Sequence, residues 1–311
     1  MTEEDYKPYL AGLTFSIVFG FSFLFSKEAL EAVAPFHLLG FRFFVASVSI
    51  SLLKIAGVIK TNFRAKSWVP LIFISIFQPV LYFTFEILGI DFTTSSQAGL
   101  MISLLPVAVA VLGAVFLNEI PGKKQRLFIA LSVIGVAIVM VAQGELGAET
   151  HILGLFLLLG AVGSGGAYNI ISRKISVDYS PAEITFFMCY CGAIFFNLIG
   201  FLRFEGNISS YTGHFFNLRV LVSALYLGGL SSVLAFFMMN YSLSRLPASQ
   251  AAVFANLTTV VSVLAGVFIR GEPFFLLQGL GALLIILGVW GTNYYDLKSG
   301  NKKTATSVNE K

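Results

Sequence analysis

Ten apolar stretches of about 20 residues follow one another along the chain, separated by short polar segments that carry most of its charge. A helix rises 1.5 Å per residue, so about 20 residues cross the ~30 Å hydrocarbon core of a bilayer. Helices that are apolar on every face suit lipid rather than one buried side. The sequence therefore predicts an all-α integral membrane protein with ten transmembrane helices. The stretches are 9–27, 35–54, 68–89, 95–117, 126–143, 152–173, 183–203, 219–240, 249–269 and 276–296.

Composition excludes a water-soluble domain. Of the 311 residues, 57% are hydrophobic and 12% are charged, against about 25% charged in an ordinary soluble protein. Too few charges are present to cover an aqueous surface, so the lipid bilayer is the expected partner of most of the chain. The formal net charge of +4 is not a nucleic-acid signal, because the position of the basic residues matters more than their total.

The positions of the basic residues predict the orientation. With the N-terminus in the cytoplasm, fifteen Lys and Arg lie in segments on the inner side and four on the outer side, while Arg42 lies within a span. Such a bias marks the cytoplasmic side of a membrane protein. We expect a multi-pass protein of the plasma (cell inner) membrane with residues 1–8 and a disordered tail, 297–311, both in the cytoplasm.

The chain contains an internal repeat. Gly20 and Pro35 recur 146 residues later as Gly166 and Pro181, and later positions recur at an offset of 153, as Ser96 does in Ser249. Repeats 1 (9–143) and 2 (152–296) each hold five spans. An odd number of spans inverts the second repeat in the membrane, and inverted repeats allow outward-open and inward-open states to exchange. The alternative is that the duplication records ancestry alone.

Several segments resemble the EamA-type repeat of the drug/metabolite transporter superfamily. They are FGFSFLFSK (19–27), PFHLLGFRF (35–43), the run 82–107, FLNE (116–119), and in the second half ASQAAVFANLTTVVSVLAGVFIRGE (248–272) and LGVWG (287–291). The resemblance implies a ten-helix inverted-repeat fold with a central cavity. It also implies secondary transport of small metabolites, often amino acids or related compounds, outward. One departure is Thr259, which stands at the repeat position of Pro106, where the family usually has a second Pro.

Two charged side chains lie well inside predicted spans, where charge is costly and indicates function. Arg42 lies seven residues into the second span, and Glu86 lies near the outer end of the third. Antiparallel helices would bring them to a similar depth, where an Arg–carboxylate pair can be bidentate. We interpret them as an outer gate or a substrate-binding pair, in which Arg42 attracts a carboxylate, or Glu86 attracts an amine or exchanges a proton. The alternative is a static ion pair, with Glu86 reaching the interface.

Uncharged polar residues within the spans are candidates for the lining of a cavity near the midplane, where transporters bind their solutes. For any one of them, the alternative is a hydrogen bond between helices. These candidates are Ser22, Gln78, Tyr82, Tyr168, Asn169, Asn240 and Asn256.

No cofactor, metal or catalytic constellation is expected from the motifs. Cys189 and Cys191 project about 200° apart on a helix, and His37, His151 and His214 have no ligand spacing for a metal. No ATP-binding motif is present, so transport would be secondary. We predict a secondary transporter of small-molecule substrates, with export as the expected direction; an importer or exchanger of the same fold, or a non-transporting structural or receptor-like protein, is the alternative. The small residues of 280–291 suit an intramolecular neighbour or a homodimer.

Overall fold

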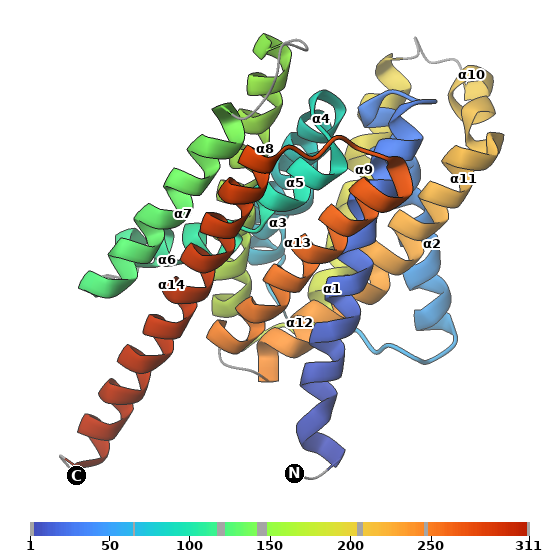
Figure 1. Ribbon diagram of the computed structural model, residues 1–311. Coiled ribbons are helices and arrows are strands. Elements are labelled where there is room, and N and C mark those ends of the chain that lie inside the picture. Colours follow the sequence, from blue (N-terminus) through green and yellow to red (C-terminus); the bar gives the residue numbers. More distant parts are fainter. Residues whose placement is uncertain are drawn as a thin grey trace.

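The computed structural model describes residues 3–64, 66–116, 122–141, 148–203, 208–245 and 248–309, and this part of the chain is all-helical. The helices lie side by side in one bundle, and the two ends of the chain lie on the same side of it (Figure 1). The first-half elements are α1 (Glu3–Leu30), α2 (Pro35–Ile55), α3 (Val69–Ser75), η1 (Ile76–Leu81), α4 (Tyr82–Phe92), α5 (Ser95–Ile102), α6 (Leu105–Phe116) and α7 (Lys123–Val141). Those of the second half are α8 (Ala148–Ile175), α9 (Pro181–Arg203), α10 (Ile208–Gly213), η2 (His214–Phe216), α11 (Leu218–Leu225), η3 (Tyr226–Ala235), α12 (Phe236–Arg245), α13 (Ala248–Arg270) and α14 (Leu276–Asn309).

Seven helices or helix runs among the described residues are long and apolar enough to cross a membrane. They coincide with seven of the ten predicted spans and establish a multi-pass membrane protein. Membrane crossing by α7, α13 and α14 stays a prediction. α14 continues to Asn309, where the sequence predicted a disordered tail from residue 297; no proline interrupts this segment, so nothing in the local sequence forces the helix to end.

Local sequence explains several helix boundaries. Pro35 and Pro181 occupy the first positions of α2 and α9, where a missing N–H costs nothing and the fixed φ favours the helix. Thr94 caps α5 by accepting from the Gln97 N–H, while the Gln97 side chain accepts from the Thr94 N–H. Gly271, at φ +67°, ends α13.

Three helix runs are interrupted within the bundle. Gln78 is extended (φ −149°, ψ 118°) inside η1, and η3 is a wide π-helical turn in the middle of the run from α11 to α12. α5 ends at Ile102 and α6 begins at Leu105, because Pro106 cannot donate a backbone hydrogen bond. Its repeat equivalent, Thr259, lies in α13, which runs without a break. The two halves therefore differ in where their helices are interrupted.

The packing buries one face of α2 against α9, η3 and α4. A Cβ atom on Gly192 of α9 would lie 2.4 Å from the Phe43 ring, and one on Gly228 of η3 would lie 2.5 Å from the Arg42 carbonyl oxygen. Only glycine permits such close helix approach. Phe43 also contacts the Phe83 and Phe196 rings, at centroid distances of 5.1 and 5.4 Å. Arg42 is thereby held among α4, α9 and η3 instead of facing lipid.

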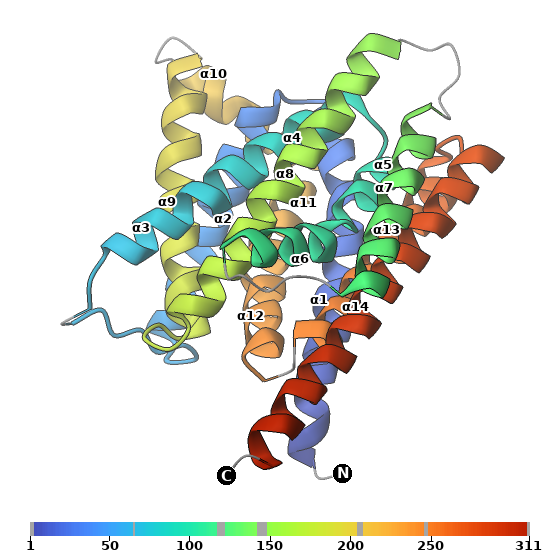
Figure 2. The same cartoon turned by 90° about the vertical axis from the view of Figure 1, so that its left-hand side faces the viewer.

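α7 and α14 form a pair at one edge of the bundle (Figure 2). The small residues of α14 face α7: a Cβ atom on Gly281 would lie 2.8 Å from the Gly135 carbonyl oxygen, and one on Gly288 would lie 2.6 Å from the Ser132 nitrogen. The small residues of 280–291 thus pack against α7 of the same chain. A homodimer through this surface stays an untested prediction.

Candidate functional site

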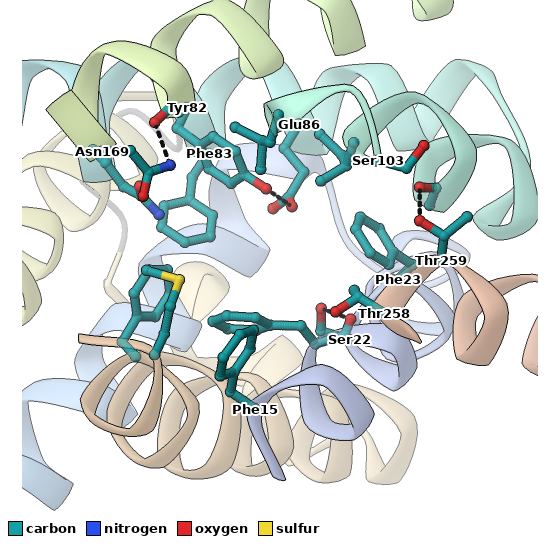
Figure 3. A pocket seen from close by; sticks show the side chains of 18 of the residues that line it. Phe15, Ser22, Phe23, Tyr82, Phe83, Glu86, Ser103, Asn169, Thr258 and Thr259 are labelled. Carbon is teal, nitrogen blue, oxygen red and sulfur yellow. Dashed lines mark hydrogen bonds between the residues drawn. The ribbon is translucent and has the colours of Figure 1, made fainter. Parts of the chain in front are cut away.

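A cavity of about 90 Å³ lies in the middle of the bundle, between α1, α2, η1, α4, α5, α8, α12 and α13 (Figure 3). Its volume is below the ~300–1,000 Å³ typical of pockets for drug-sized ligands, so this conformation suits a small solute. The side chains around it are mostly aromatic or uncharged and polar, and they come from both halves of the chain. The lining residues are Phe15, Phe19, Ser22, Phe23, Arg42, Gln78, Tyr82, Phe83, Glu86, Gly99, Ile102, Ser103, Leu105, Gly165, Asn169, Phe236, Met239, Thr258 and Thr259.

Glu86 supplies a buried carboxylate to this cavity. Its side chain is 7% exposed. The Oε1 atom accepts a hydrogen bond of 3.0 Å from the hydroxyl of Tyr82, which lies one helical turn earlier in α4 (Figure 3). The Oε2 atom lies 3.8 Å from Arg42 Nη1. That distance allows attraction between the charges but exceeds the 2.7–3.2 Å of a hydrogen bond, so the carboxylate keeps acceptor capacity.

Arg42 is anchored mainly by η3. Its Nε donates to Ser232 Oγ at 2.8 Å and its Nη2 to Ser231 Oγ at 3.1 Å. The guanidinium also lies over the Phe83 ring, 4.2 Å from the centroid, a favourable cation–π geometry. The predicted approach of Arg42 and Glu86 is therefore present, but the expected bidentate clamp is wrong: two of the three guanidinium nitrogens are directed to the serines.

Aromatic rings form much of the cavity wall. Phe19 packs edge-on against Phe236 at 5.0 Å, and Phe236 against Phe83 at 6.0 Å between centroids. Phe15 and Phe23 add further rings from α1. These faces carry negative π-density, which attracts cations.

Six of the nine predicted site residues line the cavity together, namely Arg42, Glu86, Ser22, Gln78, Tyr82 and Asn169. Their roles in binding or gating stay predictions. Two of their side chains bond locally: the Ser22 hydroxyl donates to the Phe19 carbonyl oxygen (2.7 Å), and the Asn169 amide donates to the Gly165 carbonyl oxygen (2.9 Å).

Tyr168 and Asn240 are not among the residues that line the cavity. Asn240 donates to Thr185 Oγ1 at 3.3 Å, and the Tyr168 hydroxyl lies near Asn240 and Ser172 without a hydrogen-bond partner of good geometry among the described residues. Neighbours on a helix project 100° apart, so Asn169 faces the cavity and Tyr168 does not. The Asn256 side chain lies outside the described residues.

Sequence reasoning missed Ser103, Thr258, Thr259 and the phenylalanines of the wall. The two threonines carried a signal, because they interrupt an apolar run in α13. The phenylalanines carried no such signal, since Phe is equally common on helix faces that contact lipid.

Comparison with known proteins identifies the family. The family model of the EamA-like transporter family matches residues 6–141 and 152–294. The chain belongs to the EamA-like transporter family. It is 32% identical over 296 residues to the uncharacterized transporter YcxC of Bacillus subtilis, covering 94% of this chain and 95% of that protein.

More distant relatives of this EamA-family chain occur in archaea and plants. An uncharacterized transporter of Archaeoglobus fulgidus is 26% identical, with 87% of this chain and 93% of that protein covered. A WAT1-related protein of Arabidopsis thaliana is 22% identical, with 93% and 85% covered. A solved crystal structure with 16% identity superposes at a TM-score of 0.67 over 91% of this chain and 94% of that one, which supports the fold alone. The family and the names of the relatives indicate a membrane transporter rather than an enzyme.

Proposed function

We propose that this EamA-family protein is a secondary transporter that moves a small metabolite across the plasma membrane by alternating access, with export as the direction. The observation that carries the proposal is the small central cavity, with one buried carboxylate, between the two halves of the chain. An importer or exchanger would use the same cavity. A structural or receptor-like protein would need neither the cavity nor the duplication.

The helix contacts support an inverted duplication. Each span of one repeat has an equivalent in the other, so each contact between helices predicts a second contact between their equivalents. The contact of α1 with α13 predicts one of α8 with α5 and α6. The contact of α4 with α8 predicts one of η3 and α12 with α1. Each exchanged contact occurs in the structure. α2 with α9, and α7 with α14, exchange into themselves. Such a pattern is expected of two equivalent units, whose exchange of conformations would open opposite ends of the path.

The geometry favours a solute that carries a protonated amine, such as an amino acid or a related compound. Two of the five N–H donors of the Arg42 guanidinium are taken by Ser231 and Ser232, which anchor this side chain to η3 and fix its orientation. Among the described residues, Glu86 accepts a hydrogen bond from Tyr82 alone, and its pair with Arg42 is long, so the carboxylate keeps acceptor capacity for an ammonium. An ammonium at Glu86 would also lie among aromatic faces, which adds cation–π attraction.

The test combines ligand screening with flux. Purified protein would be heated with amino acids, the matching amines without a carboxylate, and the matching acids without an amine. Because a ligand that binds only the folded state raises the unfolding temperature, we expect amino acids and amines to stabilise the protein and acids to have no effect. Counterflow of the stabilising solute into proteoliposomes then measures transport.

Two outcomes would contradict the proposal. Absence of flux for every solute under every gradient, with folded protein, argues against transport. Stabilisation by acids alone would return the binding role to Arg42. A Glu86→Gln variant checks coupling in the same vesicles, since full dependence on a pH gradient in this variant would exclude Glu86 as the proton-exchanging group.

A further inference from the structure

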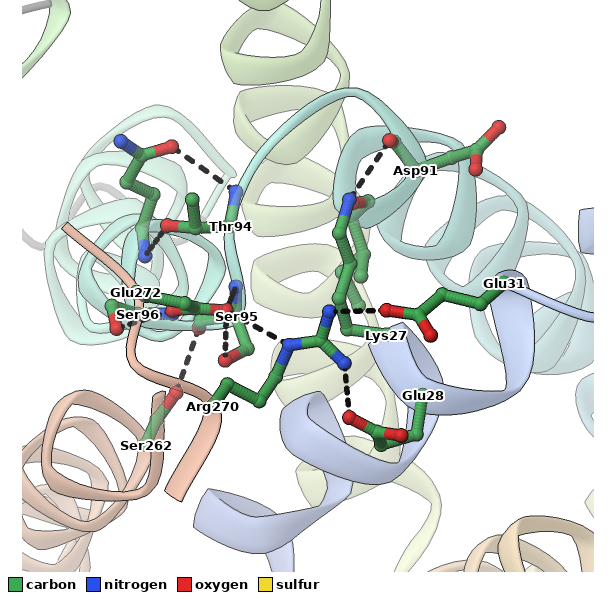
Figure 4. A network of polar contacts seen from close by, with 12 residues as sticks. Lys27, Glu28, Glu31, Asp91, Thr94, Ser95, Ser96, Ser262, Arg270 and Glu272 are labelled. Carbon is green, nitrogen blue, oxygen red and sulfur yellow. Dashed lines mark hydrogen bonds and ion pairs between the residues drawn. The ribbon is translucent and has the colours of Figure 1, made fainter. Parts of the chain in front are cut away.

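A network of charged and polar side chains joins α1, α4, α5 and α13 on the predicted outer side of the bundle (Figure 4). The same four elements wall the cavity. Lys27 lies five residues beyond the cavity residue Ser22 on α1, and Ile90 lies four beyond Glu86 on α4. At 1.5 Å per residue, the network is about 6–8 Å from the cavity, toward the predicted outer side.

One part of the network is buried and holds α5 to α13. The Glu272 carboxylate, 7% exposed, accepts hydrogen bonds from the backbone nitrogen and the hydroxyl of both Ser95 and Ser96, at 2.6–2.9 Å. Ser262 of α13 donates to the Ser95 carbonyl oxygen at 2.8 Å. A Cβ atom on Gly266 would lie 2.2 Å from Ser96 Oγ. Buried charge-assisted bonds and close backbone approach make α5 and the end of α13 one unit.

The other part is more exposed and crosses to α1. Arg270, at the end of α13, forms ion pairs with Glu28 and with Glu31, the latter at 2.7 Å, and its Nε lies 3.6 Å from Glu272. Glu31 also pairs with Arg219 at 2.8 Å. The side chains of Glu28 and Glu31 are 36% and 46% exposed. Lys27 of α1 donates to the carbonyl oxygens of Ile90 and Asp91 at 2.8 and 3.0 Å. The Arg270 side chain is 15% exposed, so the arginine is largely buried, while the two carboxylates are partly solvated and can exchange the ion pair for water when the end of α1 moves.

We propose that Arg270 with Glu28 and Glu31 is the reversible outer gate of the solute path, closed in this structure. The unit of α5 and α13, held by Glu272, forms one side of the gate, and the end of α1 forms the other. Opening separates the end of α1 from Arg270 and releases Lys27 from α4. The inference rests on the proposed function, because a gate implies a path.

Accessibility of a cysteine in the cavity tests the gate without a known solute. Cys189→Ala and Cys191→Ala provide a cysteine-free background, to which Ser22→Cys is added as the reporter. A membrane-impermeant thiol reagent is applied from the outside in right-side-out vesicles. Arg270→Glu repels Glu28 and Glu31, and Glu28→Gln with Glu31→Gln removes the partners of Arg270 on the α1 side while Glu272 remains; we expect each change to raise the labelling rate roughly two- to tenfold.

Three comparisons decide the result. Arg203→Gln removes an exposed outer charge that lies over Phe36, away from the gate, and should leave the rate unchanged. Glu28→Lys should slow the labelling of the Arg270→Glu variant, because this pair reforms with reversed sign; Glu31 is left unchanged, since it also pairs with Arg219. Unchanged labelling in Arg270→Glu, in protein that remains monodisperse, would overturn the proposal, as would faster labelling in inside-out vesicles only.

The labelling result is separable from transport. If no solute is transported but labelling responds as described, the gate stands and the proposed function fails. If a solute is transported and labelling does not respond, the function stands and the gate lies elsewhere.

Discussion

The Arg42–Glu86 pair is the residue-level feature with the largest energetic consequence. Both side chains are more than nine-tenths buried, and removing one partner of a buried pair leaves an uncompensated charge. We expect Arg42→Met to lower the free energy of unfolding by about 3–5 kcal/mol, and the double variant with Glu86→Gln to cost less than the sum of the two single variants. Unfolding of the detergent-solubilised variants measures this coupling. Additivity of the two changes would mean that the 3.8 Å contact is not an effective ion pair.

Glu272 predicts a pH dependence of stability. Burial raises the pKa of this carboxyl, but hydrogen bonds from Ser96 and Ser95 outweigh it, and the net pKa is below 4.5. A lowered folded-state pKa contributes stability that is fully present above the unfolded value of 4.5 and is lost as the pH falls through the folded value. The unfolding temperature of the protein should therefore exceed that of Glu272→Gln at pH 7, and the difference should shrink below pH 4.5. A difference that stays constant down to pH 3 would contradict the assignment.

The sequence predicted which side chains lie at the same depth in the membrane. It could not predict which face of a helix points toward the cavity. Arg42 and Glu86 were placed together because both lie in the outer halves of antiparallel spans. The serines that anchor Arg42 could not be predicted, since they depend on the turn of η3. The same limit separates Asn169 from Tyr168 and places Met239 rather than Asn240 at the cavity.

At the level of elements, the break between α5 and α6 distinguishes the two halves. Pro106 lacks the N–H that would bond to Ile102, and the cavity residues Ser103 and Leu105 lie at this break. Pro106→Ala should restore a continuous helix, slow amide exchange across residues 100–108, and slow transport if the break is a hinge. Unchanged amide exchange would show that packing, rather than the proline, interrupts the helix.

The α7–α14 pair is predicted to be a structural element, because neither helix contributes a residue to the cavity. Gly288→Ala would force a Cβ atom to within 2.6 Å of the Ser132 nitrogen, and overpacking of this kind costs about 1–3 kcal/mol. We expect a lower unfolding temperature with unchanged solute affinity. Gly279→Ala is the matched control, since its Cβ atom would lie 3.6 Å from the Phe274 ring, an ordinary contact. Equal effects of the two variants would contradict the close approach.

At the level of the whole molecule, hydropathy predicted the helical architecture because lipid imposes one requirement, apolar faces over about 20 residues. It could not predict the interruptions at Gln78 and η3, because hydropathy carries no information on backbone dihedral angles. The sequence repeat and the helix contacts relate the same spans of the two halves to each other. The boundaries of the repeats, 9–143 and 152–296, stay predictions.

Glu272 lies in the short connection between α13 and α14, and this position would couple the proposed outer gate to the bilayer if α14 crosses it as predicted. A helix at the edge of a bundle adjusts its tilt to the thickness of the hydrocarbon. Tilting α14 would pull on the connection that holds the carboxylate above Ser95 and Ser96. We therefore expect the transport rate in proteoliposomes to vary with lipid acyl-chain length, and Glu272→Gln to weaken that dependence. A protein of this design would sense the thickness of the membrane in which it works.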